Sequence, residues 1–182
     1  NKLILIPTGR SAFNKSLTIS KHRLEMLNLV FKNPNYDISR IEIDNSEQTE
    51  DQSYSFDTLK YFFNRDKNIY CFIIGTDALA NFHQWFKWKE ILNLCHILLI
   101  NRSEVDIFSQ KWRPEIKELI ENHWTKKIDD LRSNRSGFLY SVPMPRINIA
   151  SNSIRDHIKN KKDLRSLVPS QIEDYIKENS LY

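Results

Sequence analysis

Short uninterrupted apolar runs alternate along the chain with segments in which apolar residues recur every three or four positions. The runs are typical of strands that are buried on both faces of a parallel sheet, and the recurring positions are typical of helices. Strands are expected over residues 3–6, 36–43, 69–74, 96–100, 138–142 and 146–149. Helices are expected around residues 20–31, 56–63, 87–94, 114–123, 152–160 and 169–179. This alternation predicts an α/β fold with a doubly wound parallel sheet, closed by C-terminal helices.

Polar residues before several of these helices are expected to cap them. The expected N-caps are Ser20, either Ser53 or Ser55, and Ser151. In the second helix, Phe56, Leu59 and Phe63 are expected to line the buried face. Pro169 suits the first turn of the last helix, whose apolar stripe is expected to contain Ile172, Tyr175 and Ile176.

The length of 182 residues and the 40% hydrophobic content suit one folded domain with a substantial core. We therefore expect a single domain over residues 1–182. Residues 103–135 are rich in charge and could form a helical insertion.

The charge balance is 27 basic against 23 acidic residues, a mild excess that is spread along the chain. This excess does not indicate a nucleic-acid-binding face. Cys71 and Cys95 sit in apolar runs without zinc-ligand spacing, so we expect buried free thiols in a reducing compartment. No apolar run approaches the ~20 residues that cross a bilayer. We expect a cytoplasmic protein without a membrane partner, and nothing in the sequence indicates an oligomeric state.

Candidate chemistry begins where the strand at residues 69–74 ends. Gly75 and Asp77 fall at the carboxyl edge of the expected sheet, where open α/β folds bind ligands. Gly75 lets a ligand approach the backbone, and the Asp77 carboxylate can accept hydrogen bonds from a ribose diol. The same carboxylate could instead cap the helix that follows.

A second candidate is an anion site at the helix that follows Ile149. Free amides and hydroxyls at its start, with Arg155 one turn on, suit a phosphate. An ordinary cap with a surface arginine is the simpler alternative on spacing alone.

Two further segments are candidates for binding a ligand that contains a heteroaromatic ring or a small carboxylate. Phe82, Trp85, Phe86 and Trp88 closely follow Asp77 and could either stack on a heteroaromatic ring or pack in the core. The helix start near Tyr54 and Ser55 could hold a small carboxylate through its amides, or be an ordinary cap. The five histidines lack catalytic or metal-ligand spacing, so none is assigned to catalysis.

Taken in order, these stretches resemble the bacterial nicotinate-nucleotide adenylyltransferases. The matching text is HRLEML at residues 22–27, SYSFDTL at 53–59, FIIGTDAL at 72–79, the segment 82–85, IASNSIR at 149–155, and LVP…YI…LY within 167–182. The resemblance runs from the first residue to the last. It implies a Rossmann-like nucleotidyltransferase fold without its first strand, and transfer of AMP from ATP to nicotinate mononucleotide. The products would be deamido-NAD and pyrophosphate, with Mg²⁺ on the phosphates.

The resemblance also implies roles for individual residues. The ATP phosphates would be bound by Lys15, Ser151 and Arg155. The ribose and nucleotide contacts would come from Gly75, Asp77 and Arg102. The nicotinate contacts would come from Tyr54, Ser55 and Trp85.

The sequence departs from the family at three places. The family's glycine-rich loop and H-x-G-H motif are absent, and we expect the catalytic histidines to lie upstream of residue 1. A Pro-His-Lys pattern reads Phe13-Asn14-Lys15, and an Arg-Pro-Gly pattern reads Arg102-Ser103-Glu104. Two alternatives stay open. One is a related nucleotidylyltransferase with nicotinamide mononucleotide or a phosphopantetheine as acceptor, and the other is a non-catalytic nucleotide-binding module.

Overall fold

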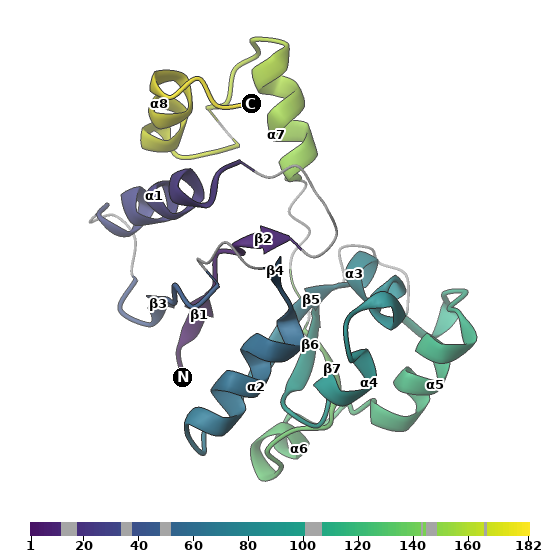
Figure 1. Cartoon of the computed structure of the whole chain (residues 1–182). Helices are drawn as coiled ribbons and strands as arrows, with labels where there is room; N and C mark the ends of the chain where they lie inside the picture. The colour runs from purple at the N-terminus through teal and green to yellow at the C-terminus, as the bar shows by residue number, and fades with distance from the viewer. Residues whose placement is uncertain are drawn as a thin grey trace. The chain divides into compact units, whose positions relative to one another are not determined.

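The structure is a computed structural model that describes residues 1–11, 18–33, 38–47, 52–100, 107–142, 144, 149–165 and 167–182 (Figure 1). The chain divides into two compact units. The first unit contains Asn1–Ser53 and Asn148–Tyr182, and the second contains Tyr54–Ile147. The expectation of one domain with an insertion at residues 103–135 stays a prediction.

The strands of the first unit form two parallel pairs. Strand β1 (Leu3–Leu5) pairs with β3 (Ile41–Ile43), and β2 (Arg10–Ser11) pairs with β4 (Gln52–Ser53). The strand predicted over residues 36–43 begins only at Ile41, because residues 38–40 form a turn; residues 36 and 37 lie outside the described part.

Three helices belong to the first unit: α1 (Ser20–Phe31), α7 (Ser151–Lys159) and α8 (Ser170–Glu178). Helices α1 and α8 are joined by a hydrogen bond of 2.9 Å between His22 Nδ1 and the Tyr175 hydroxyl. The prediction that Ser20 caps α1 is wrong. Ser20 is itself the first helical residue, and the N-cap is Ile19, which makes no side-chain capping bond.

The second unit is built on a parallel three-stranded sheet with the order β5–β6–β7. The strands are β5 (Cys71–Gly75), β6 (His96–Ile100) and β7 (Leu139–Val142). Gly75 lies opposite Ile100, and Ile100 lies opposite Val142, so the three carboxyl ends meet at one edge of the sheet. The predicted strand at 146–149 falls largely outside the described residues, and Ile149 is not in a strand.

In the described part of this unit, five helices and two 3₁₀ turns accompany the sheet: α2 (Ser55–Arg65), α3 (Thr76–Ala80), η1 (Phe82–Gln84), α4 (Trp88–Ile91), η2 (Ile107–Ser109), α5 (Pro114–His123) and α6 (Ile128–Ser133). Helix α5 has the predicted bounds, whereas α6 was not predicted. No described helix is both long and apolar enough to span a membrane.

The core of the second unit lies between the central strand and its helices. Ile97 and Leu99 of β6 are fully buried together with Leu79, Phe82 and Ile91. In α2 the buried face contains Phe62 in place of the predicted Phe63. The Phe63 ring instead lies under the Arg135 guanidinium, 3.7 Å from ring centroid to Cζ.

The two cysteines differ in exposure. Cys95 is fully buried, as predicted, and its Sγ lies 3.6 Å from the Ile91 carbonyl oxygen. Cys71 is exposed, so the expectation of two buried thiols is wrong for this residue. Within the described residues, Cys71 is on a strand that pairs with β6 on one side, so apolar sequence neighbours do not ensure burial.

Candidate active site

The turn from β5 into α3 places Gly75 and Asp77 at the carboxyl edge of the sheet. A Cβ on residue 75 would lie 2.4 Å from Asp77 Oδ1, so the Asp77 carboxylate occupies the space that only a glycine leaves open. Asp77 is exposed, and its carboxylate makes no hydrogen bond or ion pair with any described residue. It does not cap α3, whose N-cap is Gly75. An unpaired carboxylate at this edge is suited to accept hydrogen bonds from a ligand.

The start of α2 presents backbone amides beside an aromatic ring. Its N-cap is Tyr54, so the predicted caps Ser53 and Ser55 are both wrong. The amides of Asp57 and Thr58 bond to the Tyr54 carbonyl at 3.0 and 3.3 Å. The amides of Ser55 and Phe56 precede these bonds and have no partner within the helix. Such amides attract a carboxylate.

Trp85 and Phe86 connect β5 with the start of α2. The Trp85 ring lies 6.1 Å from Phe72 of β5 and 5.3 Å from Phe82, both measured between centroids. The Phe86 ring lies 4.7 Å from the Tyr54 ring. Trp85 is half-buried: its side chain packs against the hydrophobic core and is still partly accessible to solvent. The candidates Tyr54, Ser55 and Trp85 are thus held in one neighbourhood of the second unit.

The phosphate candidates Ser151 and Arg155 lie together on α7 of the first unit. The prediction that Ser151 caps this helix is wrong, because Ser151 is the first helical residue and Ala150 is the N-cap. The Ser151 side chain is exposed, and Arg155 donates a hydrogen bond to the Asn152 side-chain oxygen. Lys15 and Arg102 lie outside the described residues.

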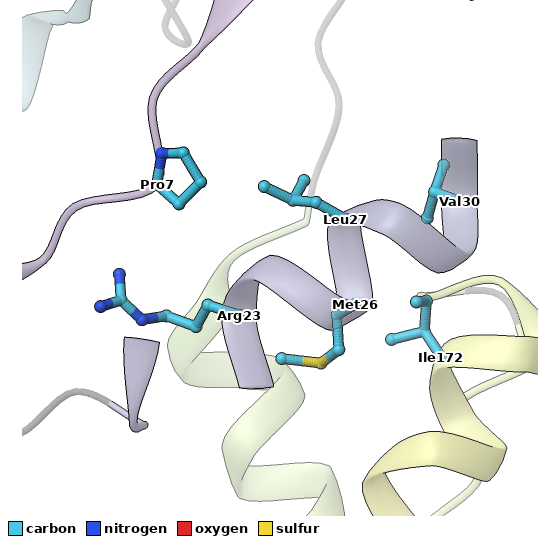
Figure 2. A pocket seen from close by; sticks show the side chains of 6 residues that line it. All are labelled: Pro7, Arg23, Met26, Leu27, Val30 and Ile172. Atoms are coloured by element: carbon cyan, nitrogen blue, oxygen red, sulfur yellow. The ribbon is translucent and has the colours of Figure 1, made fainter. Parts of the chain in front are cut away.

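A groove of about 370 Å³ in the first unit has a different character (Figure 2). Its lining residues are Pro7, Arg23, Met26, Leu27, Val30 and Ile172. Arg23 is its charged member, and the guanidinium donates to the carbonyl oxygens of Thr18 and Gly9, both at 3.0 Å. Burial lowers the pKa of Arg23. None of the predicted site residues that the structure describes lines this groove, and its apolar walls do not suit a nucleotide phosphate.

Two histidines, His22 and His96, have structural partners. His22 bonds to Tyr175, as described above. His96 is fully buried; its Nδ1 accepts from the Phe138 amide at 3.1 Å, and its Nε2 donates to the Asn134 carbonyl at 3.0 Å. These partners fix the His96 tautomer and occupy both ring nitrogens.

This chain is similar to known nucleotidyltransferases over most of its length. Residues 1–162 match the cytidylyltransferase-like family. A protein of Buchnera aphidicola subsp. Schizaphis graminum (strain Sg), named "Probable nicotinate-nucleotide adenylyltransferase", is 34% identical over 187 residues. The match covers 100% of this chain and 82% of that protein. The chain belongs to the cytidylyltransferase-like family of nucleotidyltransferases. A relative of the same name from Legionella pneumophila (strain Paris) is 32% identical, over 92% of this chain and 77% of its own.

Solved structures confirm the predicted α/β nucleotidyltransferase fold. The Plasmodium falciparum nicotinic acid mononucleotide adenylyltransferase complexed with NaAD has a TM-score of 0.72 at 18% identity. The same enzyme complexed with APC has a TM-score of 0.70 at 17% identity. Each match covers 100% of this chain and 82% of the solved one.

Lys87 is a charged neighbour of this site that the sequence did not single out. It has a left-handed backbone conformation, with φ 50° and ψ 36°, and directly follows Phe86. Nothing in the local sequence marks the conformation, because glycine, asparagine and aspartate are the residues that usually adopt it.

Proposed function

We propose that this adenylyltransferase transfers AMP from ATP to nicotinate mononucleotide, forming deamido-NAD and pyrophosphate. The chain belongs to a nucleotidyltransferase family, and the structural observation that supports the proposal most directly is the unpaired Asp77 carboxylate at the carboxyl end of β5. A carboxylate can accept both hydroxyl hydrogens of a ribose, and both substrates contain one. The names of the bacterial relatives and the NaAD in the solved structure support nicotinate mononucleotide as the acceptor.

The proposed reaction is an in-line displacement at phosphorus. An oxygen of the mononucleotide 5′-phosphate forms a bond to the α-phosphorus of ATP. The bond from that phosphorus to the oxygen bridging the β-phosphate breaks, and pyrophosphate leaves with the electron pair. No protein nucleophile is required, so the protein contributes by positioning the phosphates and stabilising their charge.

We assign the phosphates to the cationic and hydroxyl groups predicted for them: Lys15, Ser151 and Arg155. Arg155 and the exposed Ser151 hydroxyl stand on the first turns of α7, where the helix dipole also favours an anion. Removal of one such donor typically costs on the order of 3 kcal/mol of transition-state stabilisation.

We assign the ribose and nucleotide contacts to Gly75, Asp77 and Arg102. The nicotinate ring and its carboxylate are assigned to Trp85 and to the amides around Tyr54 and Ser55. The half-buried Trp85 ring supports this assignment, because its accessible side can stack on a flat heteroaromatic ring.

Mg²⁺ is proposed to enter with ATP. Among the described residues, no group of three His, Cys, Asp or Glu side chains is placed to hold a metal ion. Mg²⁺ at nucleotide sites is commonly held by substrate phosphates, water and one or two carboxylates. When bound, Mg²⁺ would neutralise phosphate charge, while Arg155 and Lys15 would orient the same phosphates. We place the reaction in the cytoplasm, where ATP is available.

The proposal is tested with the protein produced from its complete gene. It is incubated with ATP, Mg²⁺ and one acceptor at a time: nicotinate mononucleotide, nicotinamide mononucleotide or phosphopantetheine. Chromatography then measures the adenylylated product. We expect turnover to be highest with nicotinate mononucleotide. Turnover of phosphopantetheine alone, or of no acceptor, would contradict the proposal.

A further inference from the structure

Lys87 holds its ammonium beside the start of α2. Lys87 Nζ lies 4.8 Å from the centroid of the Phe56 ring and 5.4 Å from that of the Phe86 ring. Phe56 is the second residue of α2, and the Phe86 ring lies on that of the N-cap residue Tyr54. The cation therefore lies over two aromatic rings, one of which belongs to the first turn of α2.

The charge of Lys87 has no partner within the described part of the chain. The described ion pairs involve other lysines and arginines, and the contacts of Lys87 are the two aromatic rings. Aromatic faces attract an ammonium group and remove water from one side of it. An anion that approaches from the other side then meets a cation that is less screened by water than one on an open surface.

We propose that Lys87 determines specificity for the acid form of the pyridine nucleotide. This inference rests on the proposed function, which assigns the ring and carboxylate to Trp85 and the start of α2. Nicotinate carries a negative carboxylate where nicotinamide carries a neutral carboxamide. The Lys87 ammonium stabilises the carboxylate and gives no comparable advantage to the carboxamide. The amides of Ser55 and Phe56 act in the same direction.

Lys60 provides a matched control on the same ring. Its Nζ lies 5.9 Å from the Phe56 centroid, and it contacts no second ring among the described residues. Lys60 is in α2 itself, one turn beyond Phe56 and therefore further from the free amides. Substitution of either lysine by glutamine removes one positive charge near Phe56, but only Lys87 is placed between the two rings.

The test uses the protein from its complete gene as wild type and as the variants Lys87→Gln, Lys87→Arg and Lys60→Gln. The measured quantity is kcat/KM for nicotinate mononucleotide and for nicotinamide mononucleotide at saturating ATP. We expect Lys87→Gln to lower kcat/KM for nicotinate mononucleotide roughly tenfold, as for loss of one charged contact. The value for nicotinamide mononucleotide and the KM for ATP should stay the same. Lys87→Arg should keep most of the preference, and Lys60→Gln should keep all of it.

Three results would overturn the inference: equal losses with both acceptors in Lys87→Gln, an equal effect of Lys60→Gln, or a wild type that uses both acceptors equally well. A wild type that adenylylates neither mononucleotide would instead contradict the proposed function. Unchanged turnover of nicotinamide mononucleotide also shows that a variant is folded, so a loss limited to the acid form cannot come from misfolding.

Discussion

Replacement of Gly75 by alanine tests whether the Asp77 carboxylate acts from its place in the structure. The new Cβ would lie 2.4 Å from Asp77 Oδ1, which is too close for a carbon and an oxygen. Gly75 has φ −82° and ψ 162°, which alanine adopts without strain. The exposed carboxylate can rotate away. We therefore expect Gly75→Ala to displace the carboxylate and to leave the fold intact.

The expected loss follows from the hydrogen bonds that the carboxylate would make to a ribose. A hydrogen bond to a charged group contributes about 1.5–3 kcal/mol. At about 1.4 kcal/mol for each factor of ten, kcat/KM should fall roughly 10- to 100-fold. The free energy of unfolding should change by less than about 0.5 kcal/mol, as for a surface substitution.

A double-mutant cycle makes the test specific. Pyrophosphate release is measured for the wild type, Gly75→Ala, Asp77→Ala and the double variant, and urea unfolding is measured for each. Gly75→Ala should have a smaller effect in a protein that already carries Asp77→Ala, because no carboxylate is left to displace and only the direct approach of the nucleotide to residue 75 is altered. If Gly75→Ala is equally harmful in both proteins, or if it lowers stability by several kcal/mol, the reasoning is refuted.

Two further predictions concern residues of the second unit that lie outside the proposed site. Arg135→Met should lower the free energy of unfolding by about 2 kcal/mol, because the Arg135 guanidinium donates to the Phe63 carbonyl and stacks on the Phe63 ring. The control variant Arg132→Met removes an exposed ion pair and should change the free energy of unfolding by less than about 0.5 kcal/mol. An equal effect of the two in urea unfolding would contradict this. Burial raises the pKa of Cys95 to about 12. Cys71 is exposed as a residue, but neighbouring groups remove part of the water around its thiol, and this partial desolvation also raises its pKa. A thiol reagent should modify Cys71 alone in the folded protein, faster as pH rises because the thiolate fraction increases, and mass spectrometry would detect any reaction of Cys95.

The strands and helices with strong hydrophobic patterns were predicted well. Strand β6 and helix α5 have the expected bounds. The apolar run of β6 is typical of a buried strand, and the apolar residues of α5 recur at helical spacing. Helix caps were not predicted well. Ser20 and Ser151 are the first residues of their helices, and Ile19 and Ala150 are the N-caps. A serine near a helix start can occupy either position, and local sequence does not separate them.

The position of a candidate residue was predictable where a strong apolar run fixes the end of a strand. Gly75 and Asp77 could be placed at the carboxyl edge of the sheet because they directly follow such a run. Phe62 and Lys87 could not be found in this way. Adjacent phenylalanines compete for one helix face, and tertiary packing selects between them. The left-handed conformation of Lys87 depends on how the chain turns from Phe86 into α4, which no periodic pattern records.

The most direct test of the central claim is the stoichiometry of products from ATP and nicotinate mononucleotide, measured by chromatography for the wild type and for Asp77→Asn. The wild type should form deamido-NAD and pyrophosphate in equal amounts. Asp77→Asn, which keeps the shape of the side chain and removes its charge, should form both at least tenfold more slowly. Pyrophosphate without deamido-NAD, or an Asp77→Asn variant as fast as the wild type, would contradict the account.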